Sequence, residues 1–309
     1  QLLTLLNGTA LSTVIECMSD LLIQTNGKQP LLTTLVVDCA KSVLMGRATS
    51  TATSSLGAKP LESLLKALMQ LPNLSAVTTA TAAHEVDALV SITNLLQHTL
   101  MQLSTLNPSS SSRLLPNVYH VLLPLLTETN HEALIFATSQ ALTDITRTCL
   151  PLATAVDYAA IDGSPSIVQR VVLSLQNLFN IRYQHAWPVL LPIAGVCCQA
   201  IGKTAAEYVS QLVQVMGGLH SNRPEDEFQE QQLGVALGLA IQGMGPEQFF
   251  NVLTLNLDGA WEDARVWLLP ILRKHASECP LSFFARNIIP GAKLLAVRLY
   301  MNCVCIYLH

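Results

Sequence analysis

The sequence is constrained most by a helical spacing of apolar residues that recurs in pairs along the chain. In residues 114–149, two sets of apolar residues recur at intervals of three and four, on either side of the turn-like segment Thr127-Glu128-Thr129-Asn130. This spacing places each set on one face of an α-helix, and the turn residues predict that the second helix begins at His131 or Glu132. The segment is therefore interpreted as one helical hairpin. Its two apolar sets are Leu115, Val118, Leu122 and Leu125, and then Leu134, Ala137, Ala141 and Ile145.

Similar hairpins are predicted over 165–202, 204–243 and 263–290. Hydrophobic residues make up 50% of the 309 residues and charged residues only 12%, compared with about 25% charged in an ordinary globular protein. Hairpins this apolar need to be covered on more than one side, and stacking one hairpin on the next achieves this. We therefore expect an all-α protein, an α-solenoid of HEAT/armadillo-like helical hairpins.

Polar stretches divide these helical segments. Residues 46–58, 71–84, 107–112 and 220–230 have the composition of linkers or long loops. We expect three parts: N-terminal helical repeats with Ser/Thr-rich loops over 1–112, a HEAT-like array over 113–290, and an apolar tail over 291–309.

The sequence offers little that points to catalysis. Gly202-Lys203-Thr204 resembles the end of a phosphate-binding loop, but Gly195 lies seven positions before Gly202, where that motif needs five. The residues before Gly202 have a helical pattern, so we interpret Gly202 as the end of a helix. HExxH and GxSxG motifs are absent, and the eight cysteines have no metal-ligand spacing, which favours free thiols. We expect no catalytic, metal or cofactor site.

Charge and hydropathy bear on the possible partners. Residues 183–202 carry no formal charge, but Gln184, Pro188 and Pro192 favour a buried helix over a membrane span. The net charge of −4 gives no general basic excess, although residues 265–298 carry six basic residues and one acidic residue, Glu278. This basic segment has two interpretations. In the first, the cations contact RNA phosphates or acidic patches of a partner; in the second, they form an ordinary solvated ridge or pair with Glu262, Asp263 and Glu278. The cations are Arg265, Arg273, Lys274 and Arg286.

Two segments carry a specific signature: GMGPEQFFNVLTLNLDG at 243–259 and RVWLLPILRKHASECPLSFFARNIIP at 265–290. From about residue 167 to 290 the sequence resembles the ribosomal RNA-processing protein 12 family, nucleolar HEAT-repeat proteins of eukaryotic ribosome assembly. The matching residues are Trp187, Gly245, Pro246, Glu247, Leu255, Asn256, Leu257, Trp267, Pro270 and Phe284.

The chemistry of these residues is architectural. Gly245-Pro246 is typical of a turn between helices, Trp267 and Leu268 are expected to be buried, and Pro270 is expected to bend its helix. The resemblance implies a non-catalytic scaffold in the nucleus and nucleolus. Such a scaffold would bind precursor ribosomal particles, with their proteins and pre-rRNA, and other assembly or export factors, and would support pre-rRNA processing and subunit export. A transport-receptor-like HEAT solenoid that binds cargo proteins or a small GTPase remains the alternative.

Overall fold

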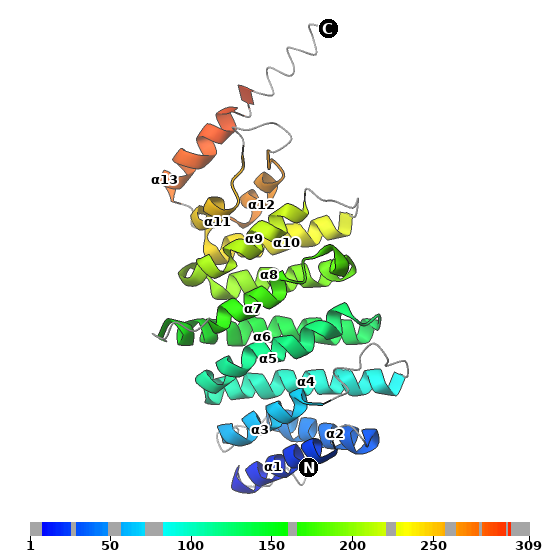
Figure 1. Ribbon diagram of the computed structural model, residues 1–309. Coiled ribbons are helices and arrows are strands. Elements are labelled where there is room, and N and C mark those ends of the chain that lie inside the picture. Colours follow the sequence, from blue (N-terminus) through cyan, green and yellow to red (C-terminus); the bar gives the residue numbers. More distant parts are fainter. Residues whose placement is uncertain are drawn as a thin grey trace. The chain divides into compact units, whose positions relative to one another are not determined.

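The computed structural model confirms the all-α prediction. Every regular element among the described residues is helical (Figure 1). By their contacts the residues form two compact units, Gln1–Ile193 and Ala194–His309, so the division falls within the helix α8 (Trp187–Ile201). The expected boundary after residue 112 lies inside the helix α5 of the first unit. The described residues are 8–25, 29–48, 57–71, 83–159, 166–220, 227–256, 264–277, 280–294 and 296–297.

The first unit consists of two layers of helices. In one layer α1 packs on α3, α3 on α5, and α5 on α7, while in the other α2 packs on α4 and α4 on α6. Contacts between α1 and α2, α3 and α4, and α5 and α6 join the two layers into pairs, as in HEAT-type repeats. The helices are α1 (Gly8–Thr25), α2 (Pro30–Ala48), α3 (Ala58–Met69), α4 (Ala83–Leu106), α5 (Pro108–Thr127), α6 (Glu132–Ala159) and α7 (Ile167–Gln176), followed by the 3-10 helix η5 (Ile181–Ala186).

The hairpin predicted over 114–149 corresponds to α5 and α6. The second helix begins at Glu132, as the turn residues predicted. All but one of the eight residues in the two apolar sets are fully buried, and Ala137 is partly exposed. A hydrogen bond between the hydroxyls of Tyr119 and Thr146 also joins the two helices inside this core.

The expectation of a loop over 107–112 is wrong. Only Asn107 separates α4 from α5, and its side-chain oxygen accepts a hydrogen bond from the Ser110 N–H at 3.1 Å. Pro108 occupies the first helical turn, where its missing N–H costs no helical hydrogen bond. The hydroxyls of Ser111 and Ser112 donate to the Pro108 carbonyl at 2.9 and 2.7 Å. This serine run therefore forms the start of a helix. The other three predicted loops lie partly outside the described residues.

The second unit contains the end of α8 and the helices that follow it. Its helices approach closely at glycines: a Cβ on Gly195 would lie 2.7 Å from the Ala236 Cα, and one on Gly243 would lie 2.5 Å from the Cys198 carbonyl oxygen. The backbones of α8 and α10 therefore touch where a side chain would not fit. After α8 come η6 (Lys203–Ala205), α9 (Ala206–Leu219), α10 (Glu227–Met244), α11 (Pro246–Val252), α12 (Leu268–His275), α13 (Leu281–Phe283) and the π-helical η8 (Phe284–Ile288).

Gly202 ends α8, as the sequence predicted. Its φ of 70° favours glycine, and its N–H donates to the Cys198 carbonyl at 3.2 Å. A helix precedes it, whereas a phosphate-binding loop follows a strand. Among the described residues no single helix is long and apolar enough to cross a membrane. The segments Ile181–Ile201 and Lys203–Leu219 meet that test only together, across a bend of 94°.

Replacing Gly195 tests the close approach of α8 and α10. We expect Gly195→Ala to lower the free energy of unfolding by about 1–3 kcal/mol, because its Cβ would meet the Ala236 backbone. In the control Gly234→Ala, within α10, the nearest atom to the new Cβ is the Ile271 Cδ1 at 3.8 Å, and removing a helical glycine should stabilise by about 0.5–1 kcal/mol. Denaturant unfolding followed by circular dichroism measures both changes. Equal stabilities for the two variants would contradict this packing.

Candidate functional site

The first signature residues form the turn between α10 and α11. Gly245 has a φ of 83°, and its N–H donates to the Ile241 carbonyl at 2.9 Å. Pro246 then occupies the first turn of α11, as predicted, and the exposed Glu247 lies in the same turn, where the helix dipole favours a negative charge. In the first unit, the signature residue Trp187 is buried at the start of α8, and its indole N–H donates to the Leu178 carbonyl at 3.2 Å. These residues set the directions of helices.

The segment after α11 is held by Arg265. Its Nη1 donates to the Thr254 carbonyl at 2.9 Å, and its backbone N–H donates to the Leu255 carbonyl at 2.8 Å. Leu255 is buried, and Asn256 adopts a left-handed φ of 51°, while Leu257 lies outside the described residues. Arg265, predicted as a contact for RNA or a partner, is therefore partly buried and bonded within its own unit.

Trp267 and Leu268 differ in burial. Leu268 is fully buried, as expected, whereas Trp267 is partly exposed, so the expectation of a buried Trp267 is wrong. One face of the Trp267 ring stacks on His220, with ring centroids 4.0 Å apart and planes 3° from parallel. The predicted bend at Pro270 is also wrong. Because α12 begins at Leu268, Pro270 lies in its first turn, where proline is tolerated.

Helix α12 packs on α10 through His275. A Cβ on Gly238 would lie 2.6 Å from the His275 ring, and Gln242 Nε2 lies 3.2 Å from His275 Nδ1. Burial, followed by the charge of Lys274, lowers the pKa of His275 and so favours its neutral form. With His275 against α10, Arg273 and Lys274 are exposed, and they line an open hollow of about 630 Å³ with Leu269 and Pro270.

The last described helical segment presents one more cation. Phe283 is buried and its ring packs at 5.3 Å from the ring of Phe250, while the signature residue Phe284 is 46% exposed. Arg286, in η8, is exposed. Three of the four predicted contact residues, Arg273, Lys274 and Arg286, thus reach solvent. The acidic residues proposed to pair with this segment, Glu262, Asp263 and Glu278, lie outside the described residues.

The buried thiols are poorly suited to nucleophilic chemistry. Burial raises the pKa of Cys149 to about 11 and that of Cys198 to about 12, and it raises the pKa of Cys197 in the same direction. These thiols are protonated at neutral pH, and the thiolate is the reactive form. In the part of the chain that the structure describes, Cys17, Cys39, Cys149, Cys197 and Cys198 are free thiols, and His, Cys, Asp and Glu form no group of three able to hold a metal ion.

Two residues that support this region are not apparent from the sequence. His220 lies in the stretch 220–230, which has the composition of a loop, and Gly238 is hidden in a helical pattern. Each acts through a partner far away in the chain, Trp267 or His275 respectively. The helical pattern does place Gly238 on α10, but only the packing against α12 shows why its lack of a side chain matters.

The region that carries the signature also matches known proteins. Residues 128–301 match the family described as "Ribosomal RNA-processing protein 12, HEAT repeats". The chain is 28% identical to the RRP12-like protein of Homo sapiens over 173 residues, which cover 53% of the chain and 13% of that protein. It is 22% identical to ribosomal RNA-processing protein 12 of Saccharomyces cerevisiae over 294 residues, which cover 91% of the chain and 23% of that protein. The chain therefore spans less than a quarter of the length of either relative.

Replacing Trp267 tests the stack with His220. We expect Trp267→Ala to lower the free energy of unfolding by about 1–3 kcal/mol, since it removes both the stacked ring and its partial burial. Trp267→Phe keeps an aromatic face opposite His220 and should lose less than half as much. Thermal and denaturant unfolding measure the two losses. If the phenylalanine variant lost as much stability as the alanine variant, the aromatic contact would not be what holds this segment.

Proposed function

The chain belongs to the ribosomal RNA-processing protein 12 family, and we propose that it acts as a non-catalytic scaffold in eukaryotic ribosome biogenesis. In this role it associates with precursor ribosomal particles and supports pre-rRNA processing and subunit export in the nucleus and nucleolus. The observation that carries the proposal is the family match over residues 128–301, more than half of the chain. Both relatives compared with the chain bear names of the same family, and one of those names refers to processing of ribosomal RNA.

The packing supports a scaffold because most signature residues have structural roles. Gly245 and Pro246 turn the chain between two helices, Arg265 holds the segment after α11, and Trp267 stacks on His220. None of these contacts assembles a nucleophile with a base. What remains for function is the exposed face of each helix, and stacked helices present such faces in series. A surface of this kind suits simultaneous contacts with the proteins and pre-rRNA of a precursor particle and with other assembly or export factors.

Within the second unit, Arg273, Lys274 and Arg286 are the proposed contacts with pre-rRNA or an acidic partner. All three are exposed, and the first two border the hollow beside Leu269 and Pro270. Arg265 is assigned a supporting role, since its guanidinium bonds to the Thr254 carbonyl. The three exposed cations thereby stay available to a partner while Arg265 stabilises the segment before them.

Gradient sedimentation tests the proposed function. The tagged protein, recovered from nuclear extract, is expected to migrate with large precursor particles, and sequencing of the associated RNA should recover pre-rRNA. Known assembly factors in the same gradient serve as the control that particles remain intact. Migration as a free protein without pre-rRNA, while those particles persist, would contradict the proposal and favour a transport-receptor-like role.

Charge reversal tests the contact residues of the second unit. We expect the double variant Arg273→Glu, Lys274→Glu to dissociate from the particles at lower salt than the wild type, because a glutamate repels the phosphate or carboxylate that each cation attracts. The matched control, Arg273→Lys with Lys274→Arg, keeps both charges and should retain association. Unchanged association of the charge-reversed variant across the salt series would remove these residues from the contact surface.

A further inference from the structure

The cations of one layer of the first unit lie on three of its four helices. Its first helix, α1, carries only acidic residues, Glu16 and Asp20. Helices α3, α5 and α7 carry four cations and a single acidic residue, Glu62. We call these four cations the cationic ladder: Lys59 and Lys66 on α3, Arg113 on α5, and Arg170 on α7. All four are exposed. Because α3 packs on α5 and α5 packs on α7, the ladder crosses three consecutive helices of one layer.

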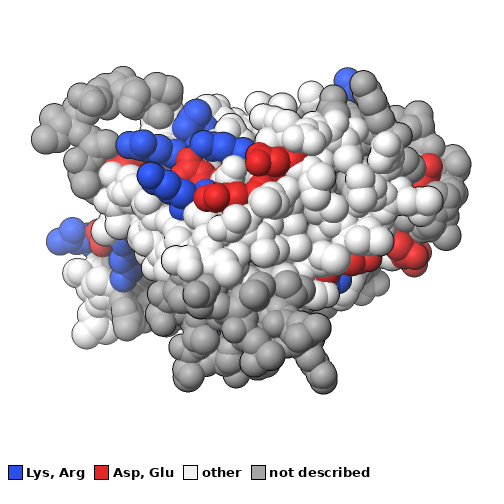
Figure 2. Space-filling model, turned by 90° about the horizontal axis from the view of Figure 1, so that it is seen from below, with Lys and Arg blue, Asp and Glu red and all other residues white. Residues whose placement is uncertain are grey.

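The helices of the other layer carry more acidic than basic residues. On α2, α4 and α6 acidic residues outnumber Lys and Arg by two to one. The excess of cations is therefore confined to α3, α5 and α7, and it is not apparent along the sequence, where helices of the other layer separate these three. Figure 2 views the molecule from below and shows Lys and Arg gathered with acidic residues on one side of that face, while most of its described surface is uncharged. The acidic residues of α2, α4 and α6 are Asp38, Glu85, Asp87, Glu132, Asp144 and Asp157, and the basic ones are Lys41, Arg47 and Arg147.

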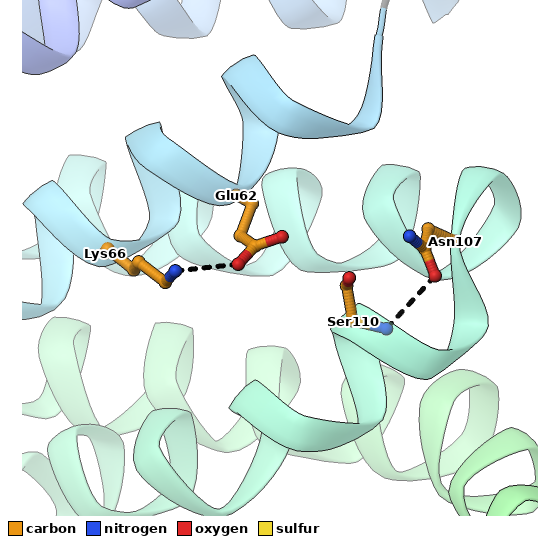
Figure 3. A network of polar contacts seen from close by, with 4 residues as sticks. All are labelled: Glu62, Lys66, Asn107 and Ser110. Carbon is orange, nitrogen blue, oxygen red and sulfur yellow. Dashed lines mark hydrogen bonds and ion pairs between the residues drawn. The ribbon is translucent and has the colours of Figure 1, made fainter.

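The single acidic residue of the ladder helices neutralises only part of this charge. Glu62 pairs with Lys66, Nζ to Oε1 at 2.7 Å, on the side of α3 that faces the start of α5 (Figure 3). The hydrogen bond from Lys66 lowers the pKa of Glu62, and Ser110 and the charge of Arg113 add to this effect. Glu62 is therefore shared between cations of two helices. Within the part of the chain that the structure describes, Lys59, Arg113 and Arg170 have no ion pair of their own.

Other hydrogen-bonding side chains lie beside two of the cations. Arg113, Asn117 and His120 lie on one exposed face of α5, at spacings of four and three residues. Next to Arg170, Gln169 is also exposed. Amide, imidazole and guanidinium groups all donate hydrogen bonds, and phosphate oxygens accept them. The exposed face of these helices is thus rich in donors. Two carboxylates lie beside it: Glu62 pairs with Lys66, and Asp157, at the end of α6, accepts hydrogen bonds from the N–H groups at the start of α7.

Exposed apolar side chains also distinguish α3, α5 and α7 from the other helices of the first unit. Helix α1, in the same layer, exposes Leu21 by 42% and Ile23 by 50%. On α3, α5 and α7 the one large apolar side chain that is well exposed, among the described residues, is Leu173. The opposite layer exposes Leu31 by 86%, Leu35 by 61% and Phe136 by 66%. A protein partner is usually anchored by apolar and aromatic side chains at the centre of the interface, whereas contacts to a phosphate backbone need none. The composition of the ladder face therefore favours a nucleic acid over a protein.

We propose that the cationic ladder binds the phosphate backbone of RNA. The choice of RNA rests on the proposed function, in which pre-rRNA is a component of the bound particle. The ladder binds without reading base sequence, since its cations and amides contact phosphate and sugar. The ladder belongs to the first unit, whereas the exposed cations of α12 and η8 belong to the second.

Direct RNA binding tests the ladder. The probe is a fluorescein-labelled single-stranded RNA of mixed sequence, and anisotropy measures its affinity for the whole chain over a salt series. For the variant with Lys59→Glu, Arg113→Glu and Arg170→Glu, we expect the affinity to fall about tenfold or more. The slope of log affinity against log salt should also become shallower by roughly 0.7 for each phosphate that the variant no longer neutralises. Lys66 is left unchanged so that its pair with Glu62 persists.

A matched single substitution controls for net charge and folding. Arg113→Glu on α5 is compared with Arg147→Glu on α6, because both arginines are exposed on helices that pack on each other and the charge change is the same. Only Arg113→Glu is expected to weaken RNA binding, and circular dichroism should show wild-type helicity for both. An RNA affinity of the triple variant equal to that of the wild type would overturn the proposal. Equal losses of affinity from Arg113→Glu and Arg147→Glu would overturn it as well, because net charge alone would then explain binding.

The outcomes separate this inference from the proposed function. If the wild type sediments with precursor particles but its RNA affinity does not depend on the ladder, only the ladder is disproved. If the ladder mutations abolish RNA binding but the wild type sediments as free protein, the ladder binds RNA and the proposed role in ribosome biogenesis fails.

Discussion

Burial of apolar faces between stacked helices is the interaction on which the structure depends. In the first unit each inner helix contacts neighbours in its own layer and in the opposite layer, so leucines such as Leu64, Leu95 and Leu122 are fully buried. Burying each of these side chains contributes about 1.5–3 kcal/mol relative to leaving it exposed. Because two or more sides of a helix are used in this way, little surface remains for charge, which accounts for the low charged content.

The same packing explains why hydroxyl residues are common inside the layers. Buried Thr99, Thr146 and Thr154 each donate a hydrogen bond to the carbonyl four residues earlier in their own helices. A buried hydroxyl satisfied within its own helix needs no partner from a neighbouring helix. Threonine and serine therefore fill small spaces in the core at little cost. The exposed faces that remain are narrow, and their charge differs from helix to helix.

Short sequence patterns predicted the helices and helix ends that depend on residues close together in the chain. The apolar spacing and turn residues predicted α5 and α6, Gly202 predicted the end of α8, and Gly245-Pro246 predicted the start of α11. The interpretation of 107–112 as a loop failed because serine is common both in loops and in the first turn of helices. Here Asn107 caps the helix and Pro108 occupies its first turn, and both favour the helix over a loop. The expected bend at Pro270 failed for a related reason: a proline bends a helix only when a full turn precedes it.

The features that the sequence did not reveal depend on residues far apart in the chain. The stack of Trp267 on His220 and the contact of Gly238 with His275 exist only once the helices of the second unit are packed. The cationic ladder is similar, because Lys59, Arg113 and Arg170 are single charges separated by many residues. A search for clustered charge along the sequence detects 265–298 instead. Only the layering of helices brings the ladder residues to one face.

The central claim is that the exposed faces of stacked helices, and no catalytic centre, carry the function of this protein on a precursor ribosomal particle. Ultraviolet crosslinking of purified particles, followed by mass spectrometry of RNA-linked peptides, tests it most directly. Crosslinked peptides are expected from α3, α5, α7 or α12, the helices that carry the proposed RNA contacts. Crosslinks confined to α2, α4 and α6 would contradict this claim. So would the absence of any RNA crosslink to the protein in particles that contain it.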